Sequence, residues 1–480
     1  YRRQLDAPLA TQDERVVNER LLLRIAAGAA RSRLIVSYPN LDMLQGRTRV
    51  PSFYALDLLR AAEGSIPDLR HLETQAARGS QSLLGWPAPR DRASAIDDAE
   101  YDLSVLEPFL RRQAPAAPGR GRFLLEANPR LTRSLRARWS RWRPGFSAAD
   151  GVVAPDPETL QGLERFQLSR RSYSPTALQR FAACPYRFLL YSVHGLKPRE
   201  EAIRLEQLDP LTRGSLIHEI QFELFCALEA RDLLSFEASE EVAISEILAE
   251  TVEKVADRYY EDLAPAIERV WRSGIEELHT DLRGWIRSLI AAGEPWRPAR
   301  FEMMFGLRRG TAPADMRGSD EAFENAEIAG GKRLHGAIDL VEEGPGGRVL
   351  RVTDHKTGKS PELRRLAVGG GKTLQPALYG MAAEELLGKV VESGRLFFCT
   401  RRGRYETLEV PLDEAVRQAV GEVLETIDRA IADGFMPAAP DRGECKWCDY
   451  NLICGPHAET QVQRKHPQRL IPLTRLREMP

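Results

Sequence analysis

One stretch constrains what this chain can fold into more than any other, residues 333–358, which read RLHGAIDLVEEGPGGRVLRVTDHKTG. Two apolar-rich runs flank Gly-Pro-Gly-Gly at positions 344–347, and this pattern is typical of two strands joined by a tight turn. We therefore predict a β-hairpin in which Glu343 pairs with Arg348 across the turn.

Two acidic residues and one lysine lie on this hairpin. In the predicted register Asp339 lies opposite Val352, and because strand side chains alternate, Asp339, Asp354 and Lys356 share one face. Mg²⁺ or Mn²⁺ binds one or two carboxylates together with phosphate and water, and a nearby ammonium can either steady the attacking nucleophile or stabilise the charge developing on phosphorus. The pattern is compatible with phosphodiester cleavage, although the same residue types are also common on solvated strands.

A helix is predicted from about Leu211, because apolar residues recur there at steps of three or four positions. His218 falls within this apolar stripe and is expected to face the core. Such a histidine is usually a structural residue, but neutral imidazole is also a good third ligand for Mn²⁺ or Mg²⁺ beside carboxylates. We therefore take His218 as a candidate metal ligand together with Asp339 and Asp354.

The motifs GAIDLV and VTDHKTG resemble motifs II and III of the PD-(D/E)XK nuclease superfamily, in its RecB-like branch. The segment GSLIH at 214–218 resembles the histidine motif of that branch, and QPALY at 375–379 resembles its Q-x-x-x-Y motif. The resemblance implies an α/β, restriction-endonuclease-like fold with helical insertions. It also implies metal ligands and catalytic residues, namely His218, Asp339, Asp354, Lys356, Gln375 and Tyr379. Glu302, on a strand predicted before the hairpin, is a candidate to support the metal ligands.

Three of the six cysteines lie close together, at Cys445, Cys448 and Cys454. Thiolates this close imply a metal, and the candidate for a distant fourth ligand is Cys184. The arrangement of one early and three late cysteines resembles the iron–sulfur staple of AddB-type and related RecB-like nucleases. That resemblance implies a [4Fe–4S] cluster, with zinc as the alternative metal.

The N-terminal part reads NERLLLRIAAGAARSRLIVSYP from Asn18, which predicts a helix followed by a strand at 34–38. This stretch resembles the last motif of superfamily 1 helicases. Ala29 stands where that motif has the arginine that touches the nucleotide γ-phosphate, and the chain contains no G-x-x-x-x-G-K-[ST] phosphate loop. ATP hydrolysis by this chain is therefore not expected.

We divide the chain into four parts on these patterns. A degenerate helicase segment spans 1–64, a mostly helical connector 65–150, the RecB-like nuclease domain with its cluster 151–460, and a C-terminal tail 461–480. Positions 130–143 hold six arginines and no acid, which predicts a helix that could lie along a phosphate backbone. A charged run is more often a solvated face, and that alternative stays open.

Composition limits the kinds of binding surface and cellular location that we expect for this chain. Its net charge of −1 gives no global basic field, so a nucleic-acid surface must be a local patch. The sequence shows no long uncharged apolar run and no signal peptide, so we expect a cytoplasmic protein without a membrane span. The first residue is Tyr1, and we expect the chain to be the C-terminal part of a longer polypeptide.

The order of these parts resembles the AddB-type subunits of helicase–nucleases. The resemblance implies a metal-dependent exonuclease that cuts single-stranded DNA, with DNA and a helicase–nuclease subunit as partners, in double-strand break repair by recombination. One alternative is a DNA-binding structural subunit that does not cut. Another is a stand-alone RecB-like nuclease.

Overall fold

The computed structural model describes the chain from residue 12 to residue 480 with gaps. The residues that it does not describe are 1–11, 40, 43–46, 66–67, 80–81, 84–85, 112–121, 123–124, 154–155, 198–204, 206, 307–321, 329, 361–366 and 456. The chain divides into two compact units, one comprising Tyr1–Trp139 and Asn451–Pro456 and the other Ser140–Tyr450 and His457–Pro480. The domain limits expected from the sequence at 64, 150 and 460 stay predictions.

The first unit is mainly helical. Its elements are α1 (Gln12–Gly28), β1 (Leu41–Asp42), β2 (Arg47–Thr48), α2 (Phe53–Glu63), α3 (Leu69–Gly79), β3 (Ser82–Leu83), β4 (Trp86–Pro89), α4 (Asp98–Arg111), most of α6 (Pro129–Arg141) and α15 (Asn451–Cys454). The strand predicted at 34–38 is wrong, because those residues form no strand and Ile35 is 74% exposed. A strand needs a partner, and the β-pairs in the described part of this unit join β1 to β2 and β3 to β4.

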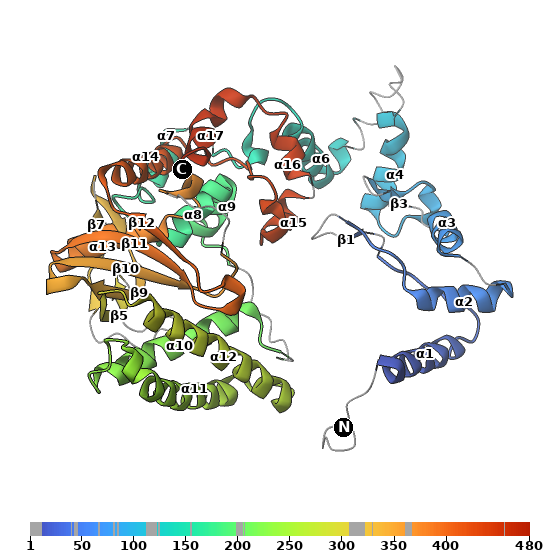
Figure 1. Ribbon diagram of the computed structural model, residues 1–480. Helices are drawn as coiled ribbons and strands as arrows, with labels where there is room; N and C mark the ends of the chain where they lie inside the picture. The colour runs from blue at the N-terminus through green and yellow to red at the C-terminus, as the bar shows by residue number, and fades with distance from the viewer. Residues whose placement is uncertain are drawn as a thin grey trace. The chain divides into compact units, whose positions relative to one another are not determined.

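A mixed β-sheet forms the centre of the second unit (Figure 1). Among the described residues it has six strands in the order β12-β11-β10-β9-β5-β6. The strands are β5 (Arg297–Phe305), β6 (Ala322–Phe323), β9 (Gly336–Glu343), β10 (Val349–Lys356), β11 (Val390–Phe398) and β12 (Thr407–Pro411), with β7 (Ala326–Ile328) and β8 (Lys332–Leu334) forming a separate pair. Strands β10 and β11 are parallel, which requires the crossover through α13 (Gln375–Leu387).

Helices cover both faces of this sheet, and each face has its own apolar core. On one face α10 (Pro210–Glu229), α11 (Glu241–Leu263) and α12 (Glu268–Ala292) pack together against Leu340 and Phe397, as Figure 1 shows below the sheet. The second core contains residues of α7 (Pro157–Glu164), α8 (Pro175–Ala183), α9 (Pro185–Phe188), α13, α14 (Glu414–Ala432) and α17 (Ile471–Arg477). Within the described part of the chain, no helix is long and apolar enough to cross a membrane.

Local signals place the helices that matter for the site. Ser174 caps α8 by accepting a hydrogen bond from the Ala177 amide at 3.2 Å, and Pro175 occupies the first turn. Asp209 caps α10 in the same way through the Leu211 amide at 2.9 Å. The described residues therefore contain a sheet with helices on both faces, as an α/β nuclease fold requires.

The last twenty residues pack into the second unit. Leu473 and Leu476 of α17 belong to its core, and the Arg477 guanidinium donates to the carbonyl oxygens of Ala182 at 2.8 Å and Ala439 at 2.7 Å. Helix α16 (Ala458–Val462) overlaps the start of this segment. The stretch set apart as a tail in the sequence is therefore integral to the packing of this unit.

Candidate active site

The register of the hairpin differs from the predicted one. The predicted pairing of Asp339 with Val352 is wrong by two positions, because Val352 pairs with Val341. The connection is longer than expected, since residues Pro345–Gly347 form a short 3₁₀ turn and Arg348 remains in the loop. A shift of two residues preserves the alternation of side chains, so the division of residues between the two faces is unaffected.

Asp354 and Lys356 lie at the end of β10 and contact each other directly. The Lys356 Nζ lies 2.5 Å from the Asp354 Oδ2. Gln375 joins both, because its Oε1 accepts from Lys356 Nζ at 2.9 Å and its Nε2 donates to Asp354 Oδ1 at 2.9 Å. Burial lowers the pKa of Lys356, but Asp354 outweighs burial and raises the pKa above its usual value, so the lysine stays an ammonium.

Close packing of α13 on β11 positions Gln375. A Cβ on Gly394 of β11 would lie 2.2 Å from the Pro376 carbonyl oxygen, so only glycine lets the first turn of α13 approach so closely. Tyr379, one turn later, is 6% exposed and packs edge-on against Phe305, with ring centroids 6.3 Å apart. Burial, followed by Asp354, raises the pKa of the Tyr379 hydroxyl far above its usual value, so this residue stays protonated.

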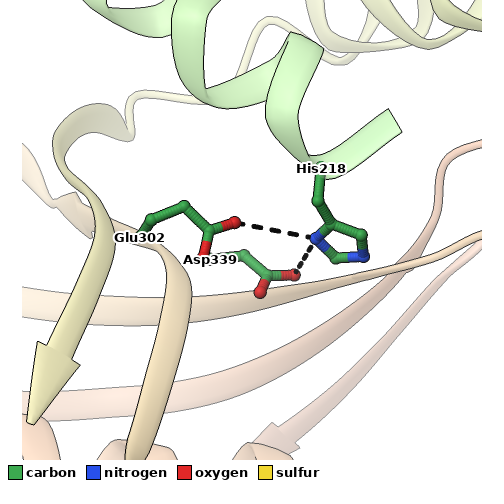
Figure 2. Close-up of side chains that lie close together, drawn as sticks. All are labelled: His218, Glu302 and Asp339. Carbon is green, nitrogen blue, oxygen red and sulfur yellow. Dashed lines mark ion pairs between the residues drawn. The ribbon is translucent and has the colours of Figure 1, made fainter. Parts of the chain in front are cut away.

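A second group of ligand-type side chains gathers His218, Glu302 and Asp339 (Figure 2). The His218 Nδ1 lies 3.3 Å from the Asp339 Oδ2 and 3.7 Å from the Glu302 Oε1. Within the described part of the chain, this is the group of three whose ligand atoms all lie within 4.8 Å of one another. Asp354 was predicted as the third ligand beside His218 and Asp339, and in the structure it instead contacts Lys356 and Gln375.

The helix that carries His218 is rotated relative to the predicted stripe. Leu211 is 81% exposed, and the buried face of α10 runs through Leu216, Ile217, Ile220 and Leu224. The expectation that His218 faces the core is therefore wrong, because the side chain lies at the edge of the buried face with 33% exposure. From that edge it reaches the carboxylates on the sheet.

The charges of this group are strongly coupled. Burial lowers the pKa of His218, but Asp339 and Glu302 outweigh it and raise the pKa to about 9. Burial raises the pKa of Asp339, His218 opposes this effect, and with Asp354 adding to it the pKa reaches about 8. Several carboxylates thus share a poorly solvated site in which their negative charges repel. A hard divalent cation relieves this repulsion, so the set of one imidazole and two carboxylates fits Mg²⁺ or Mn²⁺.

Glu302 adopts an unusual backbone conformation. Its φ of +45° is in the left-handed region, although it lies within strand β5 and between pairs that join β5 to β9, Phe301 with Leu340 and Met303 with Ile338. A non-glycine residue there costs about 1–2 kcal/mol, and such strain concentrates at functional sites. Sequence reasoning gave Glu302 only a supporting role, because its place opposite Asp339 depends on a strand pairing that the sequence does not reveal.

Three of the predicted cluster cysteines belong to two segments that contact each other. Cys184 ends α8, and the Ala183 carbonyl beside it accepts from the Asp441 amide at 2.9 Å. Arg187 donates to the Trp447 carbonyl at 3.2 Å, within the loop that carries Cys445 and Cys448. These contacts bring the early cysteine segment against the late one.

The remaining cluster cysteine is Cys454, which ends α15 in the other compact unit. Cys184 is buried, and Cys445, Cys448 and Cys454 are partly buried. Among the described residues of the second unit, Cys184, Cys445 and Cys448 do not form a group of three at ligand spacing. The assignment of an iron–sulfur cluster to these four cysteines stays a prediction.

The sheet presents Asp339 of β9 beside Asp354 and Lys356 near the end of β10, and these three residues belong to the motifs whose resemblance indicated a nuclease family. The chain belongs to the PD-(D/E)XK nuclease superfamily, whose family model matches residues 172–455. This match, together with similarity to known helicase/deoxyribonucleases, confirms the fold class and the family resemblance that the sequence motifs indicated.

Similarity to individual proteins extends over more of the chain than the family match does. The chain is similar to the B-type subunit of the ATP-dependent helicase/deoxyribonuclease of Moorella thermoacetica, with 26% identity over 401 residues that cover 81% of this chain and 32% of that protein. The corresponding protein of Natranaerobius thermophilus is 23% identical over 433 residues, which cover 87% of this chain and 33% of that protein. The Gene 69 protein of Mycobacterium phage D29 is 28% identical over 124 residues, covering 25% of this chain and 42% of that protein. The chain thus spans about a third of the length of the two helicase/deoxyribonuclease relatives.

Proposed function

We propose that this chain is a metal-dependent deoxyribonuclease that cuts single-stranded DNA as the nuclease-bearing part of a helicase–nuclease. The observation that carries the proposal is that two groups of side chains lie close together at the sheet. One is the candidate metal-ligand group of His218, Glu302 and Asp339, and the other is the hydrogen-bonded pair of Lys356 and Gln375. The names of the two longer relatives, which join helicase and deoxyribonuclease, support both parts of the proposal.

Each side chain has a role in this proposal. His218, Glu302 and Asp339 would hold Mg²⁺ or Mn²⁺, with Asp354 close enough to act electrostatically on Asp339. The bound cation would supply Lewis-acid activation of the phosphate. Lys356 remains an ammonium and stabilises the negative charge that grows on the phosphate oxygens when water attacks phosphorus. Gln375 holds the Lys356 ammonium in place, and Tyr379 lies one turn further along the same helix.

The wider setting is part of the same proposal. A partner subunit would supply ATP-driven unwinding, and the single strand released by the partner would be the substrate. Such an enzyme would process broken DNA ends in the cytoplasm for repair by recombination. A [4Fe–4S] cluster on Cys184, Cys445, Cys448 and Cys454 would join the ends of the nuclease domain, and the contact of Arg187 with the loop of the late cysteines supports this arrangement.

Metal dependence is the first test. We expect the purified protein to cleave 5′- and 3′-labelled single-stranded DNA when Mg²⁺ or Mn²⁺ is present and not in EDTA, because the carboxylate group needs a cation to act on phosphate. The same cations should raise the melting temperature of the wild type, since a ligand that binds only the folded state stabilises it, and not that of Asp339→Asn. Tight DNA binding without cleavage in either metal would instead favour the non-cutting structural subunit.

Glu302 allows a second test that separates function from folding. We expect Glu302→Gln to lower the cleavage rate at limiting Mg²⁺ by about 10- to 100-fold, because a ligand charge is lost while the shape is kept. Glu302→Gly should be equally inactive yet should not melt below the wild type, because glycine relieves a backbone strain of about 1 kcal/mol. Cleavage rates and thermal melts measure both effects.

A matched control lies on the neighbouring strand. Glu343 of β9 is partly exposed and pairs with Lys389 at 2.6 Å, away from the metal group. We expect Glu343→Gln to cleave at the wild-type rate. Full activity of Glu302→Gln at limiting metal would remove Glu302 from the proposed ligand set.

A further inference from the structure

A cavity of about 430 Å³ lies between the sheet and the helical layer of α10 and α12. It opens on the sheet face that carries Arg351, and strand alternation places this face opposite Asp354 and Lys356. We call it the rear pocket, and the residues that matter below are Phe236, Glu294, Trp296, Arg351, Arg395 and Tyr405. Its volume is in the range of small-molecule sites.

Two guanidinium groups form the floor of the rear pocket. The side chains of Arg351 and Arg395 are each only 3% exposed, and the buried carboxylate between them is that of Glu342. Arg351 Nε donates to Glu342 Oε2 at 3.0 Å, and Arg395 Nη2 donates to the same oxygen at 3.0 Å. Burial raises the pKa of Glu342, but Arg395 and Arg351 outweigh burial and lower it, so Glu342 is ionised. One fixed negative charge therefore faces two fixed positive charges.

The second carboxylate that contacts the two arginines is that of Glu294, and an anionic ligand could displace it. Glu294 lies in the connection between α12 and β5, and its side chain is 40% exposed. Its Oε2 lies 2.6 Å from Arg351 Nη2 and 3.2 Å from Arg395 Nη1. An oxygen shared by two guanidiniums has the surroundings that a phosphate oxygen has in Arg-lined anion sites. Glu294 thus occupies a place that an anionic ligand could take.

The walls are aromatic, and two of them are strained. Phe236 and Tyr405 have φ values of 50° and 56°, in the left-handed region that non-glycine residues avoid. A Cβ on Gly284 of α12 would lie 2.0 Å from the Tyr405 hydroxyl oxygen, so this glycine makes room for the tyrosine. Trp296 lies against Arg351, with the guanidinium carbon 4.7 Å from the ring centroid. Strain at two wall residues is typical of a ligand site rather than of passive packing.

We propose that the rear pocket binds a mononucleotide, with its phosphate on Arg351 and Arg395 in place of Glu294 and its base among Phe236, Trp296 and Tyr405. A fixed pair of guanidiniums selects the phosphate, and aromatic walls select a flat ring. The pocket is distinct from the metal group, and the proposal does not depend on cleavage activity.

Calorimetry on the whole chain in EDTA tests this, because the chelator removes metal-bound nucleotide from the active site. The probes are dAMP and inorganic phosphate. We expect dAMP to bind more tightly than phosphate, and Glu294→Gln to tighten dAMP binding by about tenfold, since a competing charge is removed without a change of shape. The matched control is Glu237→Gln at the same pocket, which contacts neither arginine in the described ion pairs and should change the affinity less than about twofold.

Two further variants locate the bound nucleotide. Ser288→Trp fills the rear pocket and should abolish dAMP binding, with a thermal melt to check that it folds, while Asp339→Asn should bind dAMP like the wild type. Loss of binding in Asp339→Asn would place the nucleotide at the metal group and overturn the proposal. Equal affinity for phosphate and dAMP would overturn the base site. Absence of dAMP binding to both the wild type and Glu294→Gln would overturn the pocket assignment altogether, whether or not Ser288→Trp folds.

Discussion

Replacing Lys356 by alanine is expected to lower the rate of single-strand cleavage by at least about 10²- to 10³-fold, the usual loss when one preorganised charge at a transition state is removed. The Lys356 ammonium lies 2.5 Å from Asp354, and Gln375 holds it in place. Asp354→Ala is expected to be as inactive, because it removes the carboxylate that contacts both Lys356 and Gln375 and so positions the ammonium. Single-turnover cleavage of labelled DNA measures both variants.

The controls separate chemistry from folding. Lys254→Ala changes another lysine, which is 69% exposed on α11 and paired with Glu223, and it should leave the cleavage rate unchanged. Lys356→Ala should still bind single-stranded DNA and melt within a few degrees of the wild type, because its side chain is one-third exposed. Near-normal cleavage by both Lys356→Ala and Asp354→Ala would overturn the active-site assignment.

Replacing Cys448 by alanine is expected to produce the second large effect, loss of the cluster and of much of the stability. Anaerobically purified wild type should be brown and hold about four iron and four sulfide per chain, as a [4Fe–4S] cluster requires. A cluster that joins Cys184 to the late cysteines closes a loop of hundreds of residues, and loop-closure estimates for such a link reach about 5 kcal/mol. Cys448→Ala should therefore lose colour and melt at a much lower temperature.

A second cysteine gives the matched control. Cys226 lies on α10, outside the four predicted ligands, and Cys226→Ala should keep both the iron content and the absorbance of the cluster. Colourless wild-type protein with one zinc per chain would overturn the iron assignment. An unchanged melting temperature of Cys448→Ala would show that the bound metal does not hold the domain together.

The sequence alone was sufficient to predict those elements that depend on interactions between residues close together in the chain. The alternation of apolar residues and the Gly-Pro-Gly-Gly turn predicted the two strands of the hairpin, β9 and β10. Ser174 and Pro175 set the start of α8 in the same local way, because a cap and a first-turn proline act within a few residues. The register of the hairpin was missed, because it depends on how many residues the connection absorbs.

Contacts between elements that are far apart in the sequence could not be predicted from local patterns. Glu302 stands opposite Asp339 because β5 pairs with β9, and its left-handed φ is tolerated only because the surrounding sheet holds it. The buried stripe of α10 through Leu216, Ile220 and Leu224 has the same helical spacing as the predicted stripe, so only the packing of α10 with α11 and α12 decides that His218 lies at its edge. Both features are tertiary.

By itself the sequence determined which residues could do chemistry, since Asp339, Asp354, Lys356 and Gln375 belong to short motifs whose spacing is a matter of strand and helix period. Only the tertiary structure decided which of these residues contact one another. Lys356 and Gln375 contact Asp354, whereas His218 and Glu302 lie beside Asp339. The reason is physical. Side-chain direction follows from local backbone geometry, whereas the distance between two charges depends on which strands and helices pack together, and that is set by the whole core.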